Sequence, residues 1–140
     1  MTVVLDTNTL LQLFARRSSY PVLLRAIAAG RIRVASSADI FLEYEEVVLE
    51  HAGRDRWARI AEAFRLFEVL NGNIVKVSPS FHFHVIPDDP DDDKFTDCAI
   101  TADADFIITA DRHFAPLASA GYRPKPITAE DYIREHLSGR

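Results

Sequence analysis

The chain has 140 residues, of which 48% are hydrophobic and 26% charged, as is typical of one globular domain spanning residues 1–140. Its one cysteine, Cys98, excludes an intramolecular disulfide and a zinc site built from several cysteines. The chain starts directly with a strand-like segment and has no apolar run of membrane-spanning length. We therefore expect a cytoplasmic protein without a signal peptide or a membrane partner.

The charge of the chain is distributed unevenly. The net charge of −5 argues against indiscriminate nucleic-acid binding, which depends on neutralising phosphates. However, six of the 21 acidic residues fall between Asp88 and Asp97, so the rest of the chain is close to neutral. Net charge alone therefore does not decide the class of partner.

Apolar strand-like segments alternate with helical patterns along the whole chain. Strands are predicted at residues 2–6, 31–35, 74–77, 106–109 and 122–127. The resulting order, β-α-α-β-α-α-β-α-β-α-β-α, predicts a three-layer α/β/α sandwich around a central, mainly parallel sheet of four to five strands. The last strand contains prolines, which are tolerated at a sheet edge.

Capping residues set the expected helix starts. We expect Asn8 to cap the first helix, Ser36 with Asp39 to form a capping box for the third, and Thr128 to cap the last. The aromatic residues Trp57, Phe64 and Phe67 recur at helical spacing, which favours packing in the core or at a dimer surface over stacking on bases.

Two apolar strands end in aspartates. Asp6 follows Val3-Val4-Leu5, and Asp111 follows Phe106-Ile107-Ile108 with Thr109 between them. Either aspartate can be a helix cap, but the carboxyl ends of parallel strands are also where α/β sheets bind ligands. We therefore interpret both as site residues, with Thr109 as a hydrogen-bonding support behind them.

An acidic run precedes the helix that leads into the fourth strand. Acidic residues are favourable at a helix N-terminus, but this run contains more of them than capping requires, and adjacent negative charges repel each other. Asp92 is the predicted ligand, because Phe95, Thr96 and Ala99 continue its face of the helix toward the sheet. Asp93 is expected to project elsewhere, toward solvent.

A fourth acid is expected from the glutamate-rich third helix. Glu43 lies nearest the start of that helix, and Glu46, one turn on, remains an alternative. Three or four carboxylates without a histidine triad suit Mg²⁺ or Mn²⁺ better than zinc, and such ions complete their shell with water and phosphate oxygens. His82 and His84 alternate in a loop without a third ligand at usable spacing, so we interpret them as ordinary loop residues.

Four segments occur in the order and spacing of a known family: VVLDTN, SSADIFLEYEEVV, DPDDDKFTDCAI and ADFIITAD. Together they resemble the PIN-domain ribonucleases, and more closely the VapC-type toxins of bacterial toxin–antitoxin pairs. The family pattern falls on Asp6, Glu43, Asp92 and Asp111. The position after Asp92 is often Asn in relatives and is Asp93 here, which leaves the choice between these two aspartates open.

The resemblance implies an endoribonuclease that uses Mg²⁺ or Mn²⁺ and in which water attacks an RNA phosphodiester. Asp6, Glu43, Asp92 and Asp111 would be its metal-binding and catalytic residues, and Asn8, Thr109 and Asp93 would support them. It also implies a homodimer and a cognate antitoxin. The alternative is a catalytically inert module of the same fold that binds nucleic acid or a protein partner.

Overall fold

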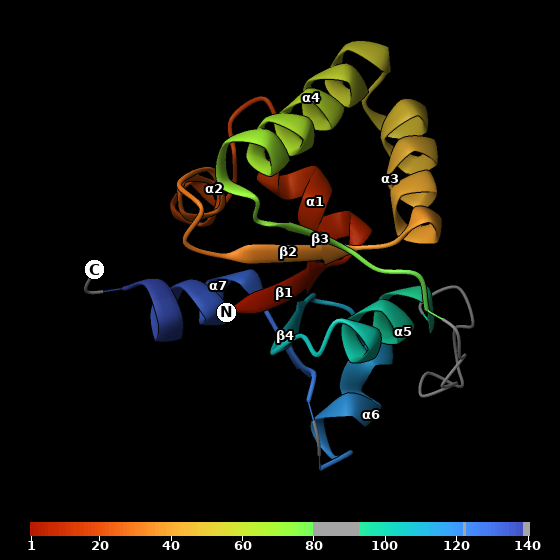
Figure 1. Ribbon diagram of the computed structural model, residues 1–140, viewed down its shortest axis with the longest axis vertical. Coiled ribbons are helices and arrows are strands. Elements are labelled where there is room, and N and C mark those ends of the chain that lie inside the picture. The colour runs from red at the N-terminus through yellow and green to blue at the C-terminus, as the bar shows by residue number, and fades with distance from the viewer. Residues whose placement is uncertain (80–92, 122, 139–140) are drawn as a thin grey trace.

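A computed structural model describes residues 1–79, 93–121 and 123–138. Its centre is a parallel five-stranded sheet in the order β3-β2-β1-β4-β5 (Figure 1). The strands are β1 (Thr2–Leu5), β2 (Arg33–Ser36), β3 (Ile74–Lys76), β4 (Phe106–Ile108) and β5 (Lys125–Ile127). The predicted parallel sheet is confirmed, and the proline-containing last strand does lie at an edge.

Helices cover both faces of this sheet. One face carries α1 (Thr7–Leu13), α2 (Pro21–Ala28), α3 (Ala38–His51) and α4 (Arg54–Asn71), and the other carries α5 (Asp93–Thr101) and α6 (Ala115–Ala118) (Figure 1). A 3₁₀ turn, η2 (Arg112–Phe114), precedes α6, and α7 (Ala129–Tyr132) continues into a π-helical turn, η3 (Ile133–Leu137). The three-layer α/β/α architecture is therefore as predicted.

The core forms where the sheet meets the helices. All four residues of β1 are buried, as expected for a central parallel strand covered on both faces. On the α1–α4 side, Phe64 of α4 packs against Phe14, Phe41 and Tyr44, with ring centroids 6.0–6.3 Å apart. Trp57 adds an edge-on contact to Phe41 at 5.1 Å. The helical-spaced aromatics are therefore packing residues, as predicted.

Two of the expected helix caps are displaced. Asp6, not Asn8, caps α1 by accepting a hydrogen bond from the Thr9 amide, and Asn8 is exposed on the first turn. Asp6 is the capping residue because β1 ends at Leu5, one residue earlier than predicted. Likewise Ser37, not Ser36, caps α3, because Ser36 is still in β2. Thr128 caps α7 as predicted.

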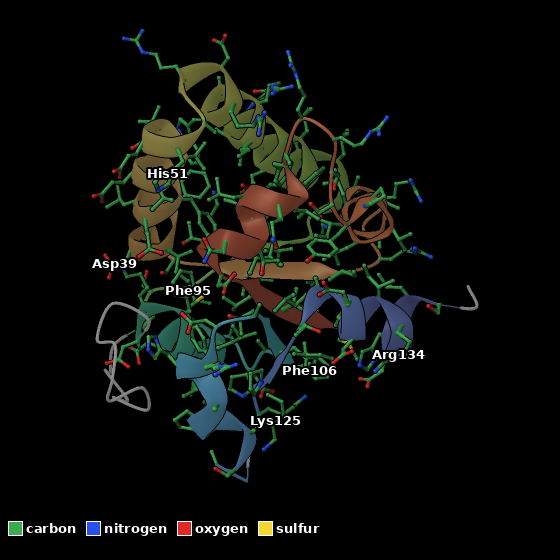
Figure 2. All side chains as sticks on the ribbon, turned by 180° about the vertical axis from the view of Figure 1, so that it is seen from behind. Asp39, His51, Phe95, Phe106, Lys125 and Arg134 are labelled. Atoms are coloured by element: carbon green, nitrogen blue, oxygen red, sulfur yellow. The ribbon has the colours of Figure 1, made fainter. Side chains whose placement is uncertain are left out.

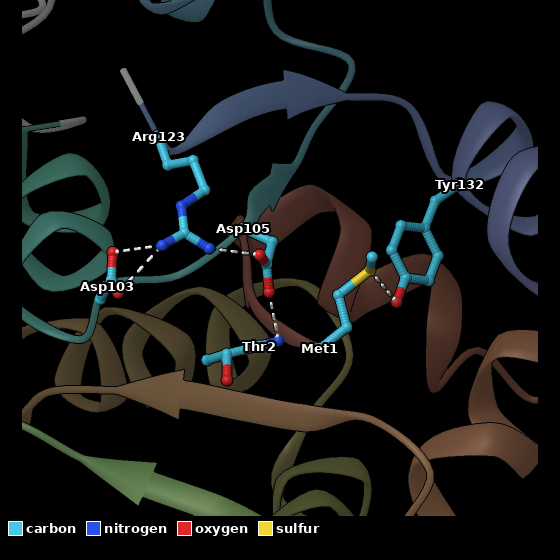
Figure 3. A network of polar contacts seen from close by, with 6 residues as sticks. All are labelled: Met1, Thr2, Asp103, Asp105, Arg123 and Tyr132. Atoms are coloured by element: carbon cyan, nitrogen blue, oxygen red, sulfur yellow. Dashed lines mark hydrogen bonds and ion pairs between the residues drawn. The ribbon is translucent and has the colours of Figure 1, made fainter.

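A forked ion pair ties the far end of the sheet together (Figure 3). Arg123 donates to Asp105 at 2.8 Å and to both oxygens of Asp103 at 3.1 Å. Asp105 also accepts from the backbone amide of Thr2 at 2.9 Å. This network joins the segment before β5 to the starts of β4 and β1, and it lies at the opposite end of the strands from Asp6.

Cys98 lies in the middle of α5 with none of its surface exposed. Burial raises the pKa of its thiol to about 12, so the sulfur stays protonated and behaves as a small apolar side chain. The buried thiol agrees with the prediction. Across the described ranges, no helix combines the length and apolar character that crossing a membrane requires.

Asn73 joins three segments where the chain enters β3. It is 2% exposed, and its side-chain amide donates to the carbonyl oxygens of Ile27 and Ile32, both at 2.8 Å. These bonds connect the end of α2, the start of β2 and the start of β3. The nearby Asn71 makes a comparable bond to Ala28 at 2.9 Å, but on an exposed surface.

Replacing Asn73 by Ala should therefore lower the free energy of unfolding by about 2–3 kcal/mol, because the buried Ile32 carbonyl loses this donor and the Ile27 carbonyl keeps only the Gly30 amide. Asn71→Ala is the matched control and should cost less than about 1 kcal/mol, because water replaces the lost donor. Urea denaturation of both variants measures the difference. Equal losses would show that burial of the Asn73 bonds does not govern their contribution.

Candidate functional site

The pairing of β1 with β4 brings the two strand-end acids together. In this register Leu5 lies opposite Ile108, and the Asp6 amide donates to the Ile108 carbonyl at 3.2 Å. The next residues, Asp6 and Thr109, therefore leave the sheet side by side. Because both strands run in the same direction, their carboxyl ends meet at one edge of the sheet.

The hydroxyl group of Thr109 links the two aspartates. It donates a short hydrogen bond to the second oxygen of the Asp6 carboxylate. It also accepts the backbone N–H of Asp111 at 2.9 Å. Thr109 is only 4% exposed, so its rotamer is fixed by packing as well as by these bonds. It occupies the supporting position that the sequence suggested.

Asp6 is a buried carboxylate, with 6% of its surface exposed. Its other oxygen accepts the Thr9 amide at 2.8 Å. Burial raises the pKa of Asp6, and the nearby Asp111 raises it further, while hydrogen bonds from Thr109 and Thr9 lower it. The net effect is a raised pKa, so the residues around Asp6 stabilise its ionised form less well than water does.

Asp111 is half-buried and caps the 3₁₀ turn that follows β4. Its Oδ1 accepts the His113 amide at 2.9 Å and lies 3.3 Å from the His113 ring nitrogen Nδ1. The cap interpretation is thus correct for Asp111 as well as for Asp6. Capping uses one oxygen of a carboxylate and does not prevent the other from contacting a ligand.

Glu43 reaches the same edge of the sheet from α3. One oxygen accepts a short hydrogen bond from the hydroxyl of Thr7, the residue after Asp6. The other lies 2.9 Å from the Nζ atom of Lys94 on α5. Glu43 is therefore held between α1 and α5, whereas Glu46 is exposed one turn further along.

Tyr44 connects Asp6 and Glu43 electrostatically. Its side chain is fully buried, and its hydroxyl donates to the carbonyl of Leu5, just before Asp6. Burial raises the pKa of Tyr44 well above its ordinary range, and the negative charges of Asp6 and Glu43 act in the same direction. Both acids are thus close enough to Tyr44 to influence its ionisation.

The start of α5 corrects one expectation. Asp93 was expected to project toward solvent but is 8% exposed, and α5, which begins with it, packs against β1, β2, β4 and α3. Asp92, the predicted ligand, lies outside the described residues, as do His82 and His84. Figure 2 shows Asp39 at the start of α3 and Phe95 at the start of α5 on the same side of the molecule, where these helices meet.

An open cavity of about 570 Å³ lies beside Glu43. It is lined by Asp39, Leu42, Glu43, Glu46, Val47 and Lys94. Another cavity, of about 470 Å³, lies beside Asp111 and includes Thr109 and Arg112. Glu43 and Asp111 are therefore accessible from solvent, whereas the buried Asp6 lines neither of these two cavities.

The acids do not converge on one point in the part of the chain that the structure describes. No group of three or more His, Cys, Asp and Glu side chains there is placed to hold a metal ion. The donor set itself suits a hard divalent cation, because it consists of carboxylate and hydroxyl oxygens. The under-compensated charge of Asp6 also fits a cation beside it, since no cationic side chain pairs with Asp6 in the described ranges.

Sequence reasoning missed two residues that hold the site. Thr7 orients Glu43, and Lys94 neutralises it. Lys94 carried a signal, because it is the only lysine or arginine between residues 77 and 111 and it directly follows the acidic run. Thr7 carried none, since its role depends on how α3 approaches α1.

Comparisons with known proteins agree with this geometry. The profile of the PIN domain family matches residues 2–113. Comparison with curated proteins gives no match. The structure is similar to a chain in the crystal structure of VapBC2 from Rickettsia felis bound to a DNA fragment from their promoter. That similarity has a TM-score of 0.53 and 17% sequence identity, and it covers 80% of this chain and 89% of the other.

At this identity, the structural similarity bears on the fold alone. The family match identifies the family as well as the fold, because it spans most of the chain. The matched range includes Asp6, Glu43, Asp93, Lys94, Thr109 and Asp111. On this basis the chain belongs to the PIN-domain family.

Proposed function

We propose that the protein is a metal-dependent endoribonuclease and the toxin of a toxin–antitoxin pair. PIN domains are generally nucleases, and these nucleases typically use divalent metals. The observation that carries the proposal is the buried, under-compensated Asp6 carboxylate, linked through the Thr109 hydroxyl to Asp111 at the carboxyl edge of the sheet. A stable fold has no need of such a charge, and functional sites are where such groups concentrate.

In this proposal Asp6, Glu43, Asp92 and Asp111 hold Mg²⁺ or Mn²⁺. The ion, when bound, supplies activation of water and neutralises charge on the phosphodiester. The protein positions the groups that hold the ion. Thr109 fixes Asp6 and the backbone of Asp111. In the reaction the water oxygen adds to phosphorus and one ester P–O bond breaks, which leaves a phosphate on one fragment and a hydroxyl on the other.

The structure favours Glu43 over Glu46 for this role, because Glu43 is held at the sheet edge by Thr7 whereas Glu46 is exposed. Asp93 is the first residue of α5 and is buried, and as the neighbour of Asp92 in the sequence it can support or replace Asp92. Asn8 is exposed two residues after Asp6, so it can contact a ligand of the site only at the solvent-facing edge of the site.

The same proposal includes an antitoxin and a second copy of the chain as partners. Similarity in fold to a chain of VapBC2 supports the first. The outer face of α4 supports protein contact in general, because Leu66, Val69 and Leu70 are 40%, 68% and 75% exposed there. Co-expression with the product of the adjacent open reading frame, followed by size-exclusion chromatography with light scattering, tests both partners.

The alternative is an inert module of the same fold. It is supported by the fact that Asp6 and Asp111 cap helical turns and that Glu43 pairs with Lys94, so each acid has a contact that needs no metal. The two functions differ in whether the purified protein cleaves RNA.

Asp6→Asn and Asp111→Asn should each lower Mg²⁺- or Mn²⁺-dependent cleavage of an RNA pool by at least about 100-fold, because each removes a charged ligand. Asp55→Asn, an exposed aspartate on the first turn of α4, is the matched control and should cleave like wild type. Gel analysis of end-labelled RNA measures the rates. Failure of highly purified wild type to cleave any RNA, or full cleavage by both variants, supports the inert module.

Thr109→Val should lower cleavage by about 10- to 100-fold, because the hydroxyl that positions both aspartates is lost while the side-chain volume is kept. Thr109→Ser restores the hydroxyl and should recover most of the rate. Initial rates at saturating metal give the comparison. A valine variant as active as the serine variant would rule out the positioning role.

Asp6→Asn should melt at the same temperature as wild type at pH 7.5 or a few degrees above it. Asn caps helices as well as Asp does and carries no buried charge. Because the folded pKa of Asp6 is raised, wild type loses stability as pH increases from the ordinary aspartate pKa through the raised value. The difference between the two proteins should therefore shrink toward pH 4.

Circular dichroism melts at both pH values measure this effect, and Mg²⁺ should raise the melting temperature of wild type alone. A variant that melts well below wild type at pH 7.5 would show that the Asp6 charge stabilises the fold.

A further inference from the structure

We propose that Lys94 is a displaceable counter-ion of Glu43. Lys94 neutralises the glutamate before metal binding, gives way to a divalent cation, and then binds a phosphate of the RNA with its freed ammonium group. This inference rests on the proposed nuclease function and concerns the regulation of the same site. Lys94 is a positioning residue in the first step and a substrate-binding residue in the second.

The contacts of Glu43 carry the first step. Both of its carboxylate oxygens are occupied, one by the Thr7 hydroxyl and the other by the Lys94 ammonium group at 2.9 Å. A metal ion that approaches the oxygen facing Lys94 is repelled by the ammonium group while this ion pair persists, because two positive charges would then lie beside one oxygen. Binding of metal at Glu43 therefore competes with Lys94.

The environment of the pair makes the competition significant. The side chains of Lys94 and Glu43 are 26% and 22% exposed, so water screens their attraction less than at a free surface. The Lys76–Glu68 pair has the same length, 2.9 Å, but its side chains are 69% and 43% exposed. The chain thus contains a second pair with the same N–O distance that differs in burial and joins β3 to α4.

The position of Lys94 carries the second step. It is one residue from the buried Asp93 on the first turn of α5, a helix that packs against β1 and β4. It also lines the open cavity of about 570 Å³ beside Glu43. A freed ammonium group on this flexible side chain has room to turn toward a phosphate entering the site, and lysine binds phosphate as a point charge.

The two steps predict opposite effects of one substitution. Lys94→Met should bind Mn²⁺ about fivefold more tightly than wild type, because a competing cation is gone. The same variant should bind RNA more weakly, and its plot of log affinity against log salt concentration should be shallower by about one, because one phosphate contact is lost. Loss of a purely structural contact would not strengthen metal binding while it weakens RNA binding.

Isothermal titration with Mn²⁺ in the absence of RNA measures the first effect, and fluorescence anisotropy with a labelled, cleavage-resistant RNA analogue in the presence of Mn²⁺ measures the second. Lys94→Arg keeps the charge and should stay close to wild type in both. Lys94→Gln provides a second neutral variant if Lys94→Met does not fold. Lys76→Met is the matched control and should leave Mn²⁺ affinity unchanged.

Mn²⁺ affinity of Lys94→Met or Lys94→Gln that equals or falls below that of wild type would overturn the proposal, as would an unchanged salt slope. These failures leave the nuclease function standing if wild type still binds Mn²⁺ and cleaves RNA. Absence of Mn²⁺ binding in every variant, wild type included, would overturn both the role of Lys94 and the proposed function.

Discussion

The parallel pairing of β1 with β4 is the contact on which the candidate site depends. It places Asp6 beside Thr109, and the Thr109 hydroxyl then joins the Asp6 carboxylate to the Asp111 backbone. α1 and η2 both begin at this edge because the two aspartates cap them. A shift of one residue in this register would separate Asp6 from Thr109 and break the hydrogen bond that joins the two strand ends.

Capping and metal binding are therefore compatible uses of the same aspartates. A cap contact occupies one lone-pair direction of one oxygen and fixes the carboxylate in space. The energetic conflict lies in burial, which disfavours the ionised form of Asp6 in the free protein. In exchange for this unfavourable burial, the Asp6 carboxylate is held rigidly at the carboxyl edge of the sheet. A mobile carboxylate on the surface would not be fixed in this way.

Much of this arrangement could be predicted from the sequence because it follows from local patterns. The apolar runs before Asp6 and Asp111 identified β1 and β4, and alternation of strands with helices identified the parallel sheet. The predicted cap at Asn8 was wrong by two residues, since helix boundaries depend on where pairing ends. The burial of Asp93 and the pairing of Glu43 with Lys94 could not be predicted, because both depend on how α3 and α5 meet across β1.

The buried thiol of Cys98 gives the protein a chemical property unrelated to its site. A sulfur with no exposed surface and a pKa near 12 presents almost no thiolate to oxidants or alkylating reagents while α5 stays packed. The side chain becomes reactive only when that helix separates from the sheet. Its rate of modification therefore reports how often the α5 layer opens, and a free cysteine in this chain poses no threat of oxidative cross-linking between native molecules.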